Sequence, residues 1–224
     1  MSELRRNNHK VFFPAAIFIA GLAIFVFIKL YNQRNIAANS IDERLKSAAG
    51  SLELVINDSL IEKAQKKGQL DIVSEDSIRL LANRIAEIHD VVYVYAMIKS
   101  NDSLYFVLSS FIDKDITNNM VTKYLDYYVE GTDVMKNAFT SSKPEIYEEV
   151  SDQWGTFRSV YLPRKTKSGT TYILCADVAL SEVIDYQLNY LIEFAVSAIF
   201  LFLISLPLII WFRNNRFNNF KSIQ

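Results

Sequence analysis

Residues 145–193, EIYEEVSDQWGTFRSVYLPRKTKSGTTYILCADVALSEVIDYQLNYLIE, decide the fold of this chain. Three runs in this stretch are rich in β-branched and aromatic residues, and they predict strands at about residues 145–150, 156–164 and 170–180. Turn signals around Gly155 and Gly169 separate the runs. The last run passes through a helix start at Ser181 into a long apolar segment. The sequence therefore predicts a sheet that is joined directly to a membrane helix.

Two apolar segments, residues 11–30 and 190–212, are long enough to cross a bilayer. Lys29 is the one charge in the first, and residues 194–212 carry none, which leaves Glu193 at the interface. At about 1.5 Å of rise per residue, roughly 20 residues span the ~30 Å hydrocarbon layer. The alternative for the first segment is a signal peptide, but its apolar run is long and lacks a clear small-x-small cleavage site. We therefore expect two transmembrane helices.

The basic residues predict the orientation. Arg5, Arg6 and Lys10 precede the first segment, and Arg213, Arg216 and Lys221 follow the second. Basic residues favour the cytoplasmic side, so residues 1–10 and 213–224 are expected there and residues 31–189 outside. That outer region holds 17 basic and 23 acidic residues. An acidic domain outside the membrane argues against a nucleic-acid partner.

Residue types that carry chemistry are sparse. The single cysteine, Cys175, has no partner for an internal disulfide, and His9 and His89 are too few for a zinc or haem site. His89 is also the one candidate base in the outer region, and phosphate-binding glycine patterns are missing. We expect no enzyme activity and no cofactor.

The outer region should begin with a long helix over residues 32–67, which Gly68 ends. One apolar stripe has a heptad-like spacing: Ala38, Ile41, Leu45, Ala48, Leu52 and Val55. A second stripe broadens it: Ala49, Ile56, Leu60 and Ile61. The second stripe either contacts a partner helix in a homodimer or joins the first in one wide core face. The sequence leaves both interpretations open.

The remaining pattern predicts an α+β domain. A second helix should run from an N-cap at Ser74 to about His89, with four residues facing inward: Ile78, Leu81, Ile85 and Ile88. Residues 91–98 and 103–109 read as a hairpin, with Tyr93 and Tyr95 on one face. Short helices are expected at residues 117–130 and 134–141. The count is a five-stranded antiparallel sheet with helices inserted in mid-chain.

Several short runs resemble the C-terminal half of Cache domains: Asp152-Gln153-Trp154-Gly155-Thr156, Tyr161-Leu162-Pro163, Ser168-Gly169 and Ala176-Asp177-Val178. The motif covers about residues 150–183, and the layout of residues 31–189 matches the whole domain. Cache domains are PAS-like extracytoplasmic sensors of bacterial chemoreceptors, sensor histidine kinases and diguanylate cyclases. The resemblance implies a single-Cache domain with a PAS-like five-stranded sheet and a long N-terminal helix. The amino-acid-binding Tyr-x-Arg-x-Trp cluster of double-Cache members is absent.

On this resemblance, a ligand would lie against one face of the sheet. Six residues are candidates for contacting it: Arg158, Tyr161, Asp177, Tyr93, Tyr95 and Trp154. Arg158 would hold a carboxylate, Tyr161 would add a hydroxyl, and Asp177 would receive an ammonium or hydroxyl donor. Strand alternation places Arg158 and Tyr161 on opposite faces unless a bulge intervenes.

Five of the six candidates also have a purely structural interpretation. Arg158 would form an ion pair or an exposed edge charge, and Asp177 would cap the turn or helix that follows. Trp154 would belong to a turn and cover the core edge, and the tyrosines of the first hairpin would pack against neighbours. The sequence does not decide between binding and structural roles.

The expected function is that of a sensor input module in a bacterial inner membrane, with a periplasmic domain that binds a small carboxylate or amine. A homodimer would pass the signal through the second transmembrane helix to a cytoplasmic output domain. Only 12 residues, 213–224, follow that helix. The output domain is therefore expected in a longer receptor, or alternatively in a separate partner. A second hypothesis is a small membrane protein whose outer domain docks a periplasmic protein.

Overall fold

The computed structural model describes residues 21, 24–25, 27–28, 39–68 and 70–221. The chain divides into two units, and the one that holds the sheet is Ala38–Ile184. The predicted first membrane segment, residues 11–30, and the start of the predicted long helix lie almost entirely outside the described residues. The following paragraphs concern the sheet-bearing unit unless stated otherwise.

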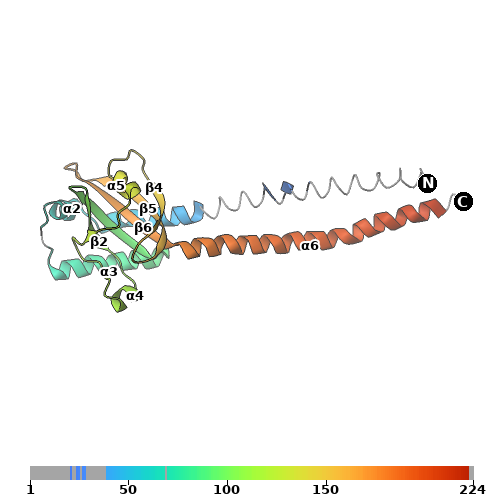
Figure 1. Ribbon diagram of the computed structural model, residues 1–224, viewed down its shortest axis with the longest axis horizontal. Helices are drawn as coiled ribbons and strands as arrows, with labels where there is room; N and C mark the ends of the chain where they lie inside the picture. The colour runs from blue at the N-terminus through green and yellow to red at the C-terminus, as the bar shows by residue number, and fades with distance from the viewer. Residues whose placement is uncertain (1–20, 22–23, 26, 29–38, 69, 222–224) are drawn as a thin grey trace. The chain divides into compact units, whose positions relative to one another are not determined.

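A six-stranded antiparallel sheet forms the centre of this unit (Figure 1). The strands are β1 (Tyr93–Ser100), β2 (Ser103–Ser109), β3 (Tyr127–Tyr128), β4 (Ile146–Ser151), β5 (Thr156–Lys165) and β6 (Thr171–Ala179). Their order in the sheet is β3-β2-β1-β6-β5-β4. The α+β class and all five predicted strands are confirmed, but the predicted count of five is wrong, because β3 pairs with the outer edge of β2.

Helical segments precede the strands, lie between them and follow them along the chain. Residues 39–51 are helical, and the elements that follow are η1 (Leu52–Leu54), α2 (Asp58–Gln65), α3 (Ile72–His89), α4 (Asp113–Thr117), α5 (Asp133–Ala138) and α6 (Leu180–Lys221). Because α6 starts at the residue after β6 ends, the predicted direct joint between sheet and exit helix is present.

The predicted uninterrupted helix over residues 32–67 is wrong within its described part. The helix breaks at η1, and α2 begins anew because the Asn57 side chain accepts a hydrogen bond from the Leu60 N–H at 2.9 Å. Its end lies just before Gly68, whose N–H donates to the Lys63 carbonyl at 2.9 Å. The members of the second apolar stripe are buried in the same core as those of the first: Ala49, Ile56, Leu60 and Ile61. The wide-core interpretation of the two stripes is therefore the one that the fold adopts.

Two other helix predictions need correction. Residues 118–126 form turns where a helix was predicted, because Asn119 and Leu125 have φ of 55° and 64° and Asp126 accepts a hydrogen bond from the Lys123 N–H. In α3, Ile78 and Ile85 do pack against the core, whereas Leu81 and Ile88 are exposed. Buried alanines take their place, Ala82 and Ala86, and the N-cap is Asp71, which accepts from the Ser74 N–H at 2.9 Å.

The sheet is buried on both faces. One face, with residues such as Val94, Ala96, Val160 and Ala176, packs against residues 39–51, α2 and α3. The other face is aromatic and is covered by α5 and the connecting loops: its core members include Tyr93, Tyr95, Met97, Phe106, Tyr128, Phe157, Tyr161 and Cys175. The predicted alternation of Tyr93 and Tyr95 against Val94 and Ala96 is confirmed. We call the second surface the tyrosine face.

The exit helix α6 continues from the sheet-bearing unit through the predicted second membrane segment, residues 190–212, and contains Pro207. Among the residues that the structure describes, no helix has both the length and the apolar character needed to cross a membrane.

Candidate functional site

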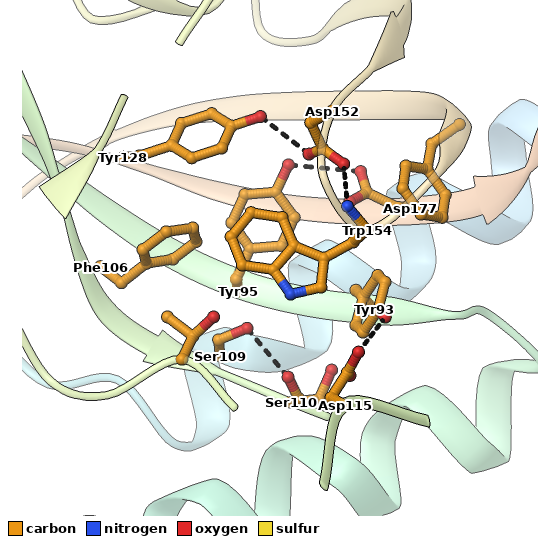
Figure 2. Close-up of a pocket in the computed structure, with 12 residues that line it drawn as sticks. Tyr93, Tyr95, Phe106, Ser109, Ser110, Asp115, Tyr128, Asp152, Trp154 and Asp177 are labelled. Carbon is orange, nitrogen blue, oxygen red and sulfur yellow. Dashed lines mark hydrogen bonds between the residues drawn. The ribbon is translucent and has the colours of Figure 1, made fainter. Parts of the chain in front are cut away.

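A cavity lies on the tyrosine face, beneath the turn that joins β4 to β5 (Figure 2). Its free space is about 30 Å³. The lining comes from β1, β2, β3, β5, β6, α4 and the loops: Tyr93, Tyr95, Phe106, Ser109, Ser110, Asp115, Thr122, Tyr128, Asp152, Trp154, Phe157 and Asp177. Six of these side chains are aromatic and three are carboxylic acids.

Each of the three carboxyl groups accepts a hydrogen bond from a tyrosine hydroxyl, and in each pair the tyrosine and the acid lie in different segments of the fold. Tyr93 donates to Asp115 at 3.0 Å, and Tyr128 donates to Asp152 at 2.9 Å. The third bond joins neighbouring strands β1 and β6, where the Tyr95 hydroxyl donates to Asp177 Oδ1 at 3.3 Å. Figure 2 shows the three acids placed around the rings, with the Trp154 indole between them.

Local backbone structure holds two of the acids in place. Asp115 Oδ2 accepts the Ile112 N–H at 2.9 Å at the start of α4. Asp152 Oδ1 accepts the N–H groups of Trp154 and Gly155, at 2.9 and 3.2 Å, within the β4–β5 turn. Asp177 instead stands in mid-strand, where the alternation of β6 directs it to the tyrosine face beside Cys175. The strands themselves therefore position Asp177.

Burial sets the protonation states in the cavity. Burial, helped by the nearby Asp152 carboxylate, raises the pKa of Asp177 to about 7, although the hydroxyl groups of Ser159 and Tyr95 oppose the shift. Burial, followed by the partner carboxylates, also raises the pKa of Tyr93, Tyr95 and Tyr128. The tyrosines thus stay neutral hydrogen-bond donors, whereas Asp177 changes its charge near neutral pH.

Trp154 separates the cavity from a larger hollow. Its indole Nε1 donates to the Met120 carbonyl at 3.2 Å, and its ring lies 6.2 Å from Phe106 and 6.1 Å from Tyr128 between centroids. The outer hollow has a volume of about 310 Å³ and a polar lining that includes Asn119, Asp126 and Gln153. The two spaces share Phe106, Thr122 and Trp154.

Four of the six sequence candidates line the cavity together: Tyr93, Tyr95, Trp154 and Asp177. Arg158 lies on the other face of β5, where its Nε and Nη2 donate to Asp42 at 3.1 and 2.9 Å. Tyr161 is on the tyrosine face but outside the cavity lining, fully buried, with its hydroxyl donating to Glu148 at 3.0 Å. The fold does not bring Arg158 or Tyr161 to the cavity.

Several cavity residues were missed from the sequence. Asp152 sits inside the DQWGT run, and the Asx-turn that it forms with Trp154 and Gly155 was a usable signal. Asp115 had no such signal, because α4 reaches the cavity only through the fold. Ser109 and Ser110 owe their place to an irregularity in the β1–β2 pairing, where the register shifts between Ala96 and Met97.

The arrangement is suited to binding. It offers several fixed carboxylates and hydroxyls in a largely apolar enclosure, as ligand pockets usually do. In the described part of the chain, no group of three or more His, Cys, Asp or Glu is placed to hold a metal ion. His89 contacts the Ser51 hydroxyl at 2.9 Å between its Nε2 and Oγ, and it is not part of the cavity lining.

No protein-family model matches this sequence, and no curated protein matches it. Among solved structures, the sensor domain of DcuS from E. coli is similar, with 13% identity and a TM-score of 0.44 over 70% of this chain and 97% of that one. A ligand-binding domain of the Campylobacter jejuni chemoreceptor Tlp3, in complex with 4-methylisoleucine, has 9% identity and a TM-score of 0.44 over 72% of this chain and 62% of that one.

The periplasmic domain of RsbU from Chlamydia trachomatis is also similar, with 14% identity and a TM-score of 0.32 over 71% of this chain and 58% of that one. The chain thus spans nearly all of the DcuS domain and less than two thirds of the Tlp3 and RsbU chains. By their descriptions these are a sensor domain, a ligand-binding domain and a periplasmic domain.

Proposed function

We propose that this chain is the input module of a membrane-bound sensor, in which the cavity on the tyrosine face binds a small ligand. The observation that carries the proposal is a cavity lined by six aromatic rings and three carboxyl groups. Burying a carboxyl group is costly, and carboxyl groups whose pKa is strongly shifted by burial, as that of Asp177 is, occur preferentially at functional sites.

The route for the signal is the joint between β6 and α6. Asp177 lies on β6, and only two residues separate it from Leu180, the first residue of α6. A ligand that shifts β6 would therefore act on the base of the exit helix. Couplings of this kind are typically worth about 1–3 kcal/mol. The receiver would be a cytoplasmic output domain of the chemotaxis, histidine kinase or diguanylate cyclase type, in the same polypeptide or in a partner.

The membrane part of the proposal rests on the sequence. Residues 11–30 and 190–212 would span the inner membrane, with both termini cytoplasmic and residues 31–189 periplasmic. Large apolar side chains of α6 are exposed in this segment, among them Leu191, Ile192, Val196, Ile199 and Phe200. Lipid would cover them.

A second candidate function is docking of a periplasmic protein. It is favoured by three exposed apolar residues of α3: Leu80, Leu81 and Ile88. Because the second stripe of the first helix is buried, these residues also replace that stripe as the candidate contact in a homodimer.

Thermal unfolding of the full chain in detergent micelles tests the proposal, with small carboxylates, amines and amino acids added one at a time. A ligand at about 100 times its Kd adds roughly 2.7 kcal/mol, which for a protein of this size raises Tm by several degrees. A hit should quench or shift Trp154 fluorescence. If no compound raises Tm and a Leu81→Asp, Ile88→Asp variant abolishes signalling, the docking function replaces ligand binding.

A further inference from the structure

The cavity carries charge of one sign. Its three ionisable carboxyls, Asp115, Asp152 and Asp177, have no Lys, Arg or His beside them among the twelve lining residues. The outer hollow adds Asp126 and likewise has no basic residue in its lining. A ligand carboxylate placed here would meet like charge in a poorly solvated space, where repulsion is strong.

Arg158, the arginine that was expected to bind a ligand carboxylate, forms an ion pair outside the cavity. Arg158 is engaged at two points by Asp42 on the opposite face of the sheet, and its guanidinium lies 5.3 Å from the centroid of the Tyr147 ring. Bringing it to the cavity would require β5 to turn over. The described lining therefore holds no cationic side chain that would pair with the carboxylate of an amino acid or a dicarboxylate.

The aromatic rings favour a cation in the same space. Tyr93 packs edge-on against Phe157 at 5.6 Å, and Phe106 packs against Tyr128 at 5.4 Å and Tyr95 at 5.7 Å, all between ring centroids. Ring faces attract organic cations, most strongly where water is excluded. Carboxylates beside rings form a site for a positively charged group.

The size of the cavity and its hydrogen-bond acceptors limit which kind of cation can bind. The free space of about 30 Å³ is enough for about two water-sized groups, so it accepts an ammonium head but not a bulky quaternary one. An ammonium has three donors and needs acceptors. Asp177 is the acceptor best able to respond, because Asp115 and Asp152 already accept backbone N–H groups.

We infer that the ligand is a primary ammonium compound without a carboxylate, whose head binds Asp177 inside the cavity and whose tail passes Trp154 into the outer hollow. This inference rests on the proposed function and adds the ligand class to it. The buried carboxyl of Asp177 supports it, because its pKa near 7 allows an arriving cation to ionise it fully.

The experiment compares four probes on the full chain in detergent micelles at pH 7.5: butylamine, butanol, butanoate and 4-aminobutanoate. Butylamine should raise Tm and change Trp154 fluorescence. Butanol, which is equal in length but uncharged, and butanoate should do neither. 4-Aminobutanoate should bind at least ~10-fold more weakly than butylamine because its carboxylate meets Asp126 or Asp152.

Two variants locate the binding site. Asp177→Asn should abolish the effect of butylamine, whereas Asp102→Asn should keep it. Asp102 is matched because it lies in the exposed β1–β2 turn at φ 66°, a conformation that Asn accepts. Because the comparison of butylamine with butanol uses the wild-type chain, it holds even if Asp177→Asn fails to fold.

The outcomes separate the two proposals. A rise in Tm with butanoate but not with butylamine overturns the ammonium inference and leaves ligand binding intact. Equal effects of butylamine and butanol overturn it too, as does butylamine binding that survives Asp177→Asn. If none of the four probes raises Tm, the ammonium inference is also overturned. The proposed ligand-binding function is overturned only if no compound of the wider screen raises Tm.

Discussion

Arg158 of β5 and Asp42 of the helical residues 39–51 form a two-point ion pair across 116 residues of sequence, with N–O distances of 3.1 and 2.9 Å. About a quarter of each side chain is exposed. The pair fixes the first helix to the sheet on the face opposite the cavity. This contact joins two distant parts of the chain, whereas the sequence left Arg158 open to either an ion pair or a ligand role.

A double-mutant cycle on this pair should show coupling without loss of binding. Arg158→Ala and Asp42→Ala should each destabilise the domain, and their coupling energy should be about 1–2 kcal/mol, since the geometry is bidentate and partly buried. The matched control is the more exposed Arg164–Glu53 pair, expected at about 0.5 kcal/mol. Denaturant unfolding gives the energies. If Arg158→Ala kept the stability of the wild type but no longer responded to ligand, Arg158 would be a ligand-binding residue after all.

Asp177 should make stability depend on pH. Its folded pKa of about 7 lies above the ordinary 3.8, so between about pH 4 and 7 the folded protein holds a proton that the unfolded chain has lost. Stability should therefore fall as pH rises through this window and level off above it. A shift of about three units corresponds to roughly 4 kcal/mol in total. The groups that influence the charge of Asp177 or respond to it include Ser159, Tyr95, Asp152, Cys175 and Tyr161.

Asp177→Asn should remove that slope. Relative to the wild type, the variant should gain about 2–3 kcal/mol in free energy of unfolding between pH 5 and pH 8. Asp102→Asn is the control, because the Asp102 pKa is lowered by Lys99 and its slope has the opposite sign. Urea titrations at several pH values measure both. Parallel curves for wild type and Asp177→Asn would mean that Asp177 is not held protonated.

Most of the fold could be predicted from the alternation of residues along the strands and from the turn residues between them. The period-2 pattern of residues 91–98 placed Tyr93 and Tyr95 on one face, and the same reasoning separated Arg158 from Tyr161. Helix boundaries failed where side chains offered the backbone local alternatives. Asn57 capped a new helix inside the predicted long one, and Asp126 formed a turn that led to β3.

The candidate site was predicted only in part, because its acids come from three distant parts of the chain. Asp177 follows from the strand pattern, but Asp115 and Asp152 reach the cavity through a short helix and a turn. Their role becomes visible only in the three hydroxyl–carboxyl pairs. No local periodicity encodes which tyrosine meets which acid, since each pair depends on strand order and register.

Gly155 should be intolerant of a side chain. Its φ is 158°, and an added Cβ would lie 2.9 Å from Cζ of Phe157, a ring of the cavity lining. Gly155→Ala should cost about 1–3 kcal/mol and weaken ligand binding by displacing that ring. Gly50→Ala is the control: it lies in the helical residues 39–51 with open space around it and should gain up to about 1 kcal/mol. Thermal unfolding gives the stability of both variants relative to the wild type. If Gly155→Ala were as stable as Gly50→Ala, the predicted clash with Phe157 would be refuted.

Arg44 ties the beginning of the exit helix to the first helix. Its guanidinium bonds Glu182, in the first turn of α6, and Asp90 at the end of α3, the latter at 3.0 Å. Its Nε is buried without a hydrogen-bond partner, so the side chain depends on these two carboxylates. If a ligand at Asp177 moves β6, the Arg44–Glu182 contact is the first restraint on α6 that the movement must strain.

Glu182→Gln should therefore loosen the base of α6 while leaving the cavity unchanged. Amide hydrogen exchange in the first turns of α6 should become about 3- to 10-fold faster, which corresponds to a loss of roughly 1 kcal/mol. Ligand affinity should stay within about twofold, because Glu182 is not among the residues that line the cavity. Glu87→Gln, which removes the exposed Arg84–Glu87 pair of α3, should leave exchange in α6 unaltered. Unchanged exchange in Glu182→Gln would show that the sheet alone restrains the exit helix, and transmission would then depend on the β6–α6 joint without Arg44.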